Sequence, residues 1–357
     1  MKSAKPKVLH SLCGQPIVTY VVKALKLAGI DRIIMVVPPT SDAAIKSLVG
    51  ADIEYVVQRS PLGTGNAVAQ AARLLKTHSG TILVTGGDTP LIPYANIEGI
   101  LESHAVQNST ITILTAFSTT GNGLGEITRN SSGDIVDIVE ATQSYIPDGI
   151  QMETNVGLYA FEPSWLWSAL PRIPLSPTNE YFLTSLISIA NQENRKIDNL
   201  VLQDPQFAVG INTRVQLAQV EATMRSQIRS GWMENGVTIL DPQSTFIDET
   251  VTLSPDTIIY PNTMIFGHTN IGGNCQIGPN TVITESQIGE GCIIMASYLD
   301  NAKLGDRISV GPFSHLRPGT DLESDVHIGN FSEIKNSHIK SGTSMGHFGY
   351  IGDASIG

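Results

Sequence analysis

The chain has 357 residues, more than one hydrophobic core usually accommodates, so we expect two domains. The formal net charge of −11 argues against a nucleic-acid-binding surface, which needs clustered Lys and Arg. Three widely separated cysteines predict neither a disulfide framework nor a zinc site. The N-terminal segment lacks the apolar core of a signal peptide, and no apolar run has the length of a bilayer span. We therefore expect a cytoplasmic protein that binds neither nucleic acid nor a membrane.

From residue 31 to residue 212, short apolar segments alternate with segments whose apolar residues have helical spacing. We expect strands within residues 31–39, 53–58, 81–92, 109–117 and 153–163, and helices within 42–49, 65–78 and 96–107. This alternation predicts an α/β domain with a largely parallel sheet and helices on both faces. In such sheets, ligands bind beyond the carboxyl ends of the strands.

A single helix is predicted after this domain. In residues 213–232, the apolar side chains of Leu217, Val220, Met224 and Ile228 fall on one stripe. We expect this helix to join the two domains. The predicted boundaries are 1–211 for the first domain, 212–236 for the linker helix and 237–357 for the second domain.

A six-residue period replaces the helical pattern from about residue 237. Apolar residues recur in one phase, after an irregular patch in a second phase, and finally in a third. The first phase contains Ile247, Leu253, Ile259, Ile265, Ile271, Ile277 and Ile283, the second Leu304, Val310, Leu316, Leu322, Ile328 and Ile334, and the third Ile339, Met345 and Ile351. This period predicts a parallel β-helix of hexapeptide repeats, in which each side of a coil points one aliphatic residue inward.

Polar residues at strand ends and helix starts are the first candidates for chemistry. Asp88 follows an apolar strand and two glycines, and it is either a turn-capping residue or a metal-binding carboxylate. Gly63 and Gly65 flank Thr64 before a helix, where unpaired N–H groups favour anions or base carbonyls, although such glycines often serve the backbone alone. Asn212 precedes the linker helix, where it needs no function beyond capping.

Longer motifs carry a resemblance to a known family. The sequences KPKVLH, PLGTGNA, GGDTPLI, ETNVGLY, NEYFLTS and VGINTRVQL occur in this order, followed by GPFSHLRPGTDL, HIGNFSEIKNS and GHFGYIGDASIG. In this combination the chain resembles the bacterial bifunctional N-acetylglucosamine-1-phosphate uridylyltransferase/glucosamine-1-phosphate N-acetyltransferase family, GlmU. The resemblance covers nearly the whole chain. It implies a Rossmann-like nucleotidyltransferase domain followed by a left-handed β-helix that assembles as a homotrimer.

The resemblance also implies a role for each matching residue in uridylyl transfer. The oxygen of the sugar phosphate attacks the α-phosphate of UTP, and pyrophosphate leaves. By similarity, Asp88 and Asn212 hold Mg²⁺, Lys7 offsets the charge of the nucleotide phosphates, Gln58, Gly63 and Thr64 contact the uracil, and Gly125, Glu140 and Asn155 line the N-acetylglucosamine pocket.

For acetyl transfer from acetyl-CoA, the resemblance points to the β-helix. Arg317 and Lys335 match the cations that bind the phosphate of glucosamine 1-phosphate, and Tyr350 and Asn336 lie in the same pattern. His347 matches the general base that deprotonates the sugar amine, a role suited to the pKa of histidine. Without the family resemblance, the sequence indicates only that His347 is a solvent-facing residue of the repeat.

The chain departs from the family pattern at both ends. A strand and a glycine-rich loop are expected before residue 1, and further coils that bind acetyl-CoA are expected after residue 357. We therefore expect a fragment of a larger gene product that has lost acetyl transfer. Smaller departures, at Asn66, Gly86, Leu124, Glu126, Ser185, Ser344 and Met345, affect the expected geometry of the sugar sites.

Two other interpretations remain open from the sequence. The chain could be another sugar-phosphate nucleotidyltransferase with a hexapeptide domain, such as an ADP-glucose synthase. It could also be a non-catalytic sugar-nucleotide-binding or scaffold protein.

Overall fold

The computed structural model describes residues 1–40, 42–50, 52–119, 124–140 and 150–357. The chain forms two compact units. Unit 1 contains Met1–Ser11 and Pro16–Val220, and unit 2 contains Leu12–Gln15 and Glu221–Gly357. The division falls within the helix α7 (Arg214–Glu234), so the helix predicted as a separate linker is shared between the units. Within the described residues, no helix is long and apolar enough to cross a membrane.

Unit 1 is an α/β structure in which the strands and helices predicted above all occur. Its strands are β3 (Ile34–Val37), β4 (Glu54–Val57), β5 (Ile82–Thr85), β6 (Ile111–Ser118), β7 (Glu126–Arg129), β8 (Ile135–Val139), β9 (Met152–Phe161) and β10 (Ile197–Leu202). Its helices are α1 (Ile17–Leu27), α2 (Asp42–Val49), α3 (Thr64–Leu75), α4 (Tyr94–Gln107), α5 (Pro163–Ala169) and α6 (Ser185–Gln192), with the 3₁₀ turns η1 (Lys7–Leu9), η2 (Leu170–Arg172) and η3 (Pro205–Ala208).

The main sheet is mixed, and the prediction of a largely parallel sheet was wrong. Its strand order is β10-β6-β9-β7-β8, with β5 also paired to β9. Strands β10 and β6 are parallel, whereas β9 is antiparallel to β5, β6 and β7. The described residues between β6 and β9 form the β7–β8 pair and contain no helix of the kind that usually joins parallel neighbours. The pair β3–β4 is a separate parallel ladder.

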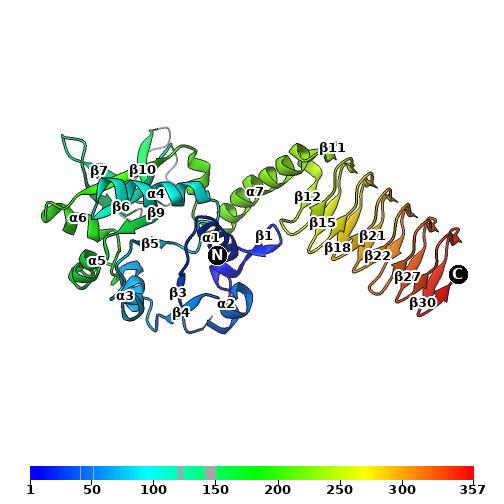
Figure 1. The fold of residues 1–357 in the computed structure, drawn as a ribbon, viewed down its shortest axis with the longest axis horizontal. Helices are drawn as coiled ribbons and strands as arrows, with labels where there is room; N and C mark the ends of the chain where they lie inside the picture. The colour runs from blue at the N-terminus through cyan, green and yellow to red at the C-terminus, as the bar shows by residue number, and fades with distance from the viewer. Residues whose placement is uncertain (41, 51, 120–123, 141–149) are drawn as a thin grey trace. The chain divides into compact units, whose positions relative to one another are not determined.

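Alternate residues of β6 face two different apolar clusters. Ile111 and Ile113 pack with residues of α5 and α6, and Leu114 and Ala116 pack with residues of α1 and α4. The sheet is therefore covered on both faces, as the sequence predicted. Figure 1 shows α4 crossing the strands β6 and β9, which it contacts.

Unit 2 is a three-sided parallel β-helix of the left-handed hexapeptide type, as predicted, and Figure 1 shows its coils stacked in order. Each side is a ladder of seven strands. The first side contains β11 (Thr238–Ile239), β14 (Ile258–Ile259), β17 (Gln276–Ile277), β20 (Ile293–Ile294), β23 (Ser309–Val310), β26 (His327–Ile328) and β29 (Ser344–Met345). The second contains β12 (Phe246–Ile247), β15 (Met264–Phe266), β18 (Val282–Thr284), β21 (Tyr298–Asp300), β24 (His315–Leu316), β27 (Glu333–Lys335) and β30 (Tyr350–Gly352). The third contains β13 (Thr252–Leu253), β16 (Asn270–Ile271), β19 (Gln287–Ile288), β22 (Lys303–Leu304), β25 (Asp321–Leu322), β28 (His338–Ile339) and β31 (Ser355–Ile356).

The part of the sequence where the six-residue period breaks down, between Ile283 and Leu304, is an uninterrupted part of the β-helix with shorter sides. Ile265 pairs with Ile283, 18 residues later, whereas Ile283 pairs with Leu299, only 16 residues later. Ile288 and Ile294 fill the core positions between them and are buried. The phase of the sequence pattern changes because the sides from Ile283 to Ile288, from Ile294 to Leu299 and from Leu299 to Leu304 have five residues each, while the ladders continue without interruption.

The four-residue segment Leu12–Gln15 joins unit 2 although the residues on either side belong to unit 1. It forms the tip of a two-stranded hairpin, β1 (Ser11–Leu12) and β2 (Gln15–Pro16). Cys13 and Gly14 make the turn with φ of 43° and 87°, the left-handed conformation that two-residue hairpin turns favour. The carbonyl of Cys13 accepts a 3.1 Å hydrogen bond from the N–H of Glu249, which anchors the tip to the first coils.

Candidate active site

Three residues from distant parts of unit 1 meet just after the carboxyl end of β5. Lys7 lies on η1, Asp88 follows β5 by three residues, and Asn212 lies just before α7. The N–H of Ile211 donates to the carbonyl of Asp88 at 2.9 Å, which holds the two loops together. The Lys7 Nζ donates to Oδ2 of Asp88 at 2.5 Å and to Oδ1 of Asn212 at 2.7 Å.

The arrangement of these oxygens fits a divalent cation. Oδ2 of Asp88 and Oδ1 of Asn212 converge on a single positive charge, the Lys7 ammonium group. Mg²⁺ prefers oxygen ligands and is commonly held by one or two protein groups together with substrate phosphates and water. Within the described residues, no group of three or more His, Cys, Asp or Glu side chains could hold a metal ion. These residues can therefore form a metal site in which only a few ligands come from the protein.

Gly86 has no side chain, and this leaves room for the Asp88 carboxylate. A Cβ at Gly86 would lie 2.6 Å from Oδ1 of Asp88, closer than real contacts allow. Any side chain at this position would therefore need a different Asp88 conformation. This departure affects the metal-ligand candidate directly, whereas the sequence placed its effect in the sugar pocket.

A second group of predicted residues surrounds the start of α3. The Gln58 Nε2 donates to the carbonyl of Gly63 at 3.2 Å and to Oδ1 of Asn66 at 2.9 Å. Asn66, one of the departures, thus orients the side chain predicted to contact uracil. Oγ1 of Thr64 accepts a 2.9 Å hydrogen bond from the N–H of Leu183. The predicted nucleobase residues are adjacent in the structure, and Leu183 is a partner that no local pattern indicated.

The predicted sugar-pocket residues form a third group at β8 and β9. The N–H of Asn155 donates to the carbonyl of Gly125 at 2.8 Å, and its side chain donates to the hydroxyl of Tyr159 at 2.6 Å. Burial raises the pKa of the Tyr159 hydroxyl, and the Glu140 carboxylate raises it further, so Tyr159 stays protonated. Oε1 of Glu140 accepts a 2.5 Å hydrogen bond from Oγ1 of Thr184.

Tyr159 and Thr184 were missed by the sequence reasoning, although both lie in motifs that it quoted. Nothing in ETNVGLY or NEYFLTS distinguishes a hydroxyl that bonds a predicted site residue from one that faces solvent. Residues 141–149, which follow Glu140, and residues 120–123, which precede Gly125, lie outside the described residues.

In unit 2 the predicted acetyltransfer residues gather on the second side of the last coils. His315, Glu333 and Tyr350 are paired across β24, β27 and β30, and Lys335 is paired with Gly352. The Arg317 Nη1 donates to Oε1 of Glu333 at 2.8 Å. The two predicted phosphate-binding cations therefore lie in adjacent coils of one ladder, with Tyr350 in the next coil.

His347 lies at the corner that leads into β30, and its side chain is exposed. Its ring contacts Phe348 in a T-shaped arrangement with centroids 5.6 Å apart. Phe348 in turn stacks on Phe331, and Phe331 stacks on Phe313, with centroid distances of 5.0 and 5.3 Å. The three phenylalanines have φ between 54° and 61°, so the same corner repeats in three coils. His347 therefore lies at a corner whose conformation recurs in three coils, three residues before Tyr350.

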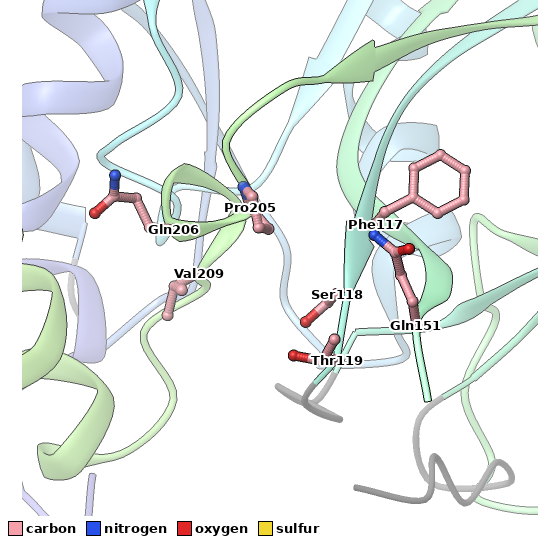
Figure 2. A pocket seen from close by; sticks show the side chains of 7 residues that line it. All are labelled: Phe117, Ser118, Thr119, Gln151, Pro205, Gln206 and Val209. Carbon is pink, nitrogen blue, oxygen red and sulfur yellow. The ribbon is translucent and has the colours of Figure 1, made fainter. Parts of the chain in front are cut away.

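A cavity of about 330 Å³ in unit 1 lies apart from these groups. Its lining comes from the end of β6, the residue before β9, and η3 with Val209: Phe117, Ser118, Thr119, Gln151, Pro205, Gln206 and Val209 (Figure 2). None of the seven side chains is charged, so this cavity provides no counter-charge for a phosphate. It contains none of the predicted site residues.

Comparisons with known proteins identify the family of the chain. The nucleotidyl transferase family model matches residues 1–234. Proteins named bifunctional protein GlmU align with the whole chain: that of Lactococcus lactis subsp. lactis is 41% identical, that of Heliobacterium modesticaldum 39%, and that of Brevibacillus brevis 37%. The chain covers 78%, 78% and 77% of these three relatives, respectively. With a nucleotidyl transferase domain and a hexapeptide β-helix in the same order, the chain belongs to the GlmU family of bifunctional proteins.

Proposed function

We propose that unit 1 transfers a uridylyl group from UTP to N-acetylglucosamine 1-phosphate, forming UDP-N-acetylglucosamine and pyrophosphate. The main support is the convergence of Asp88 and Asn212 on one cation position after β5. Both substrates are anionic, and the net charge of the chain is −11, so local cations must offset their charge.

Each group of residues has a distinct task in this proposal. Gln58, Gly63 and Thr64 bind the uracil, and Gly125, Glu140 and Asn155 bind the sugar. Asp88 and Asn212 would hold Mg²⁺, which neutralises charge on the triphosphate and the sugar phosphate. Lys7 places a positive charge beside Asp88 and Asn212 and interacts with the nucleotide phosphates. Because the attacking phosphate oxygen needs no activation by a base, positioning and charge neutralisation carry the reaction.

The experiment is an assay of pyrophosphate release by the purified chain with Mg²⁺ and pairs of nucleotides and sugar 1-phosphates. We expect UTP with N-acetylglucosamine 1-phosphate to give the highest rate. An equal or higher rate with ATP and glucose 1-phosphate would support an ADP-glucose synthase instead. Tight binding of UDP-N-acetylglucosamine in isothermal titration without turnover would support a non-catalytic binding protein.

The β-helix supports a second proposed function, the binding of glucosamine 1-phosphate, the substrate that receives the acetyl group in the family that the chain resembles. Arg317 and Lys335 bind the phosphate from adjacent coils, Tyr350 lies beside them, and His347 lies at the position of the base that would take a proton from the sugar amine. Isothermal titration with glucosamine 1-phosphate tests this proposal. We expect Lys335→Met to weaken binding about tenfold or more, because a charge-assisted contact is lost. Unchanged binding would contradict the assignment.

We also propose that the β-helix assembles the chain into a homotrimer in the cytoplasm, where UTP and acetyl-CoA are available. Sedimentation equilibrium of the purified chain tests the oligomeric state. A monomer over the micromolar range would contradict it.

A further inference from the structure

One short segment of unit 1 contacts both the proposed nucleobase residues and the proposed sugar residues. This segment, Tyr181–Thr184, lies immediately before α6 and is called the bridge segment below. Leu183 and Thr184 are buried, at 3% and 7% exposure, although a short loop segment of this kind is usually accessible.

On the nucleobase side, the bridge segment runs along the loop before α3. The N–H of Tyr181 donates to the carbonyl of Leu62 at 2.8 Å, and the carbonyl of Tyr181 accepts from the N–H of Gly65 at 2.8 Å. The N–H of Leu183 donates to Oγ1 of Thr64 at 2.9 Å. These are three successive hydrogen bonds between two segments far apart in the chain.

The two segments are in close backbone contact at two glycines. A Cβ at Gly63 would lie 2.7 Å from the carbonyl oxygen of Tyr181, and a Cβ at Gly65 would lie 3.0 Å from the same atom. The two backbones therefore touch directly, without side chains between them. A ligand that repositions the Gly63–Thr64 loop must also reposition the bridge segment.

On the sugar side, the bridge segment ends at the carboxylate proposed to bind the sugar. Oγ1 of Thr184 donates to Oε1 of Glu140 at 2.5 Å. One turn later in α6, Oγ of Ser188 donates to Oδ1 of Asp137 at 2.5 Å, which attaches the helix to β8, the strand that leads to Glu140. The orientation of the Glu140 carboxylate thus depends on where the bridge segment lies.

We infer that the bridge segment couples the two halves of the proposed uridylyl-transfer site, with Thr64 and Thr184 as its positioning residues. Nucleotide binding fixes the Gly63–Thr64 loop, the loop fixes the bridge segment through Leu183, and Thr184 then holds Glu140 in the orientation that accepts hydrogen bonds from the sugar. The two substrates therefore bind with positive coupling, which by linkage is equal in both directions. This inference rests on the proposed function for the identity of the two ligands.

The test is a set of isothermal titrations of the full chain with N-acetylglucosamine 1-phosphate, with and without saturating α,β-methylene-UTP. We expect the nucleotide analogue to tighten sugar-phosphate binding by a factor of about five or more in the wild type, within the usual range of coupling. Thr64→Val removes the acceptor for Leu183 at nearly constant volume, and we expect it to reduce this factor to about one. Thr64→Ser keeps the acceptor and should restore the coupling.

Thr178→Val is the matched control. Oγ1 of Thr178 interacts with Ser176 and Glu180 in the same loop, away from the Thr64 and Glu140 contacts. It should keep the coupling of the wild type. From the sugar side, Thr184→Val should raise the KM for UTP as well as that for the sugar phosphate, and Thr184→Ala serves if the valine variant does not fold.

The outcomes separate the inference from the proposed function. Uridylyl transfer by the wild type with no coupling, or coupling that survives in Thr64→Val, would overturn the inference and leave the function. If the wild type shows coupling but no transfer activity, and the coupling disappears only in Thr64→Val, the inference is supported and the proposed function is overturned. A wild type that binds neither ligand would contradict both.

Discussion

The two units place their functional side chains in different ways. In the β-helix, each side chain lies next to the residue one coil away, and paired residues are 16 to 20 positions apart. In unit 1, the contacts of the candidate site join residues 44, 119 and 205 positions apart. A repeat builds a site by stacking equivalent corners, whereas the α/β unit builds one by bringing separate loops to the same place. The two units should therefore respond differently to substitution.

The largest expected effect is loss of the β-helix fold on placing a charge in its core. Ile277 is fully buried and stacks between Ile259 and Ile294 in neighbouring coils. Ile277→Asp buries an unpaired carboxylate and leaves a gap, so we expect a loss of about 4 kcal/mol or more in the free energy of unfolding. Urea denaturation followed by circular dichroism measures this loss.

Gln276→Asp is the control for this prediction, because Gln276 is the exposed neighbour on the same strand. It should change the free energy of unfolding by no more than about 0.5 kcal/mol. Similar effects of the two substitutions would mean that the inward and outward faces of the ladder are not distinguished as described.

The next largest effect is expected at the cation position of unit 1. Asp88→Asn keeps an oxygen at the same place but removes the negative charge that faces Lys7 and would face Mg²⁺. We expect kcat for uridylyl transfer to fall about 10²–10³-fold, as for loss of one strong electrostatic contact in an active site. The Mg²⁺ concentration needed for half of the maximal rate should rise.

Asp134→Asn is the matched control, because Asp134 is an exposed acidic residue in the β7–β8 turn of the same unit. Its kcat and Mg²⁺ requirement should match those of the wild type. An Asp88→Asn variant that behaves like Asp134→Asn would remove Asp88 from the proposed metal site.

This contrast explains how much could be predicted from the sequence. The β-helix followed from the spacing of Ile247 to Ile283, because one inward residue per side is a local rule. The sides near Ile288 and Leu299 are shorter by one residue. The six-residue spacing therefore breaks down there in the sequence, although the ladders continue. Five strands of unit 1 were also predicted, but β7, β8 and β10 were not. The predicted parallel direction was wrong for β9, since the mixed sheet depends on what connects β6 to β9.

The candidate site was predictable only as far as the family resemblance reached. The resemblance named Lys7, Asp88 and Asn212 separately, and the structure joins them through one ammonium group. Thr184 carried no signal, because its importance comes from Glu140, 44 residues earlier in the chain. Tyr159 carried none because a strand pattern does not show that its hydroxyl accepts a hydrogen bond from Asn155 in the same strand.

A smaller effect is expected from the close backbone contact at Gly63. Gly63→Ala places a side chain where φ is 95° and where its Cβ would lie 2.7 Å from the Tyr181 carbonyl. The loop must move away from the bridge segment, and we expect the KM for UTP to rise about tenfold, equivalent to about 1.4 kcal/mol.

Gly133→Ala separates the two causes of this effect. Gly133 has a φ of 88°, but a Cβ there would meet nothing within 4 Å. It should lower stability by about 1 kcal/mol through backbone strain alone and leave the KM for UTP unchanged. A tenfold rise in the KM for UTP in both variants would show that strain, and not contact with Tyr181, is responsible.

The smallest expected effect concerns Cys13, at the hairpin tip that belongs to unit 2. Burial raises the pKa of the Cys13 thiol to about 12, and the carboxylates of Glu221 and Asp248 add to this against the opposing effect of Arg225. The folded pKa is thus above the unfolded value, so the stabilisation is fully present below the unfolded pKa and is lost as the pH rises toward the folded pKa. Near pH 9.5, we expect the wild type to have lost about 1 kcal/mol relative to neutral pH through this group. Cys13→Ala lacks the thiol but keeps the other titrating groups, so the difference between the two urea-unfolding free energies from pH 8 to pH 10.5 isolates the contribution of Cys13. Parallel pH profiles would mean that the thiol is exposed, and that the hairpin tip does not pack against the first coils of the β-helix.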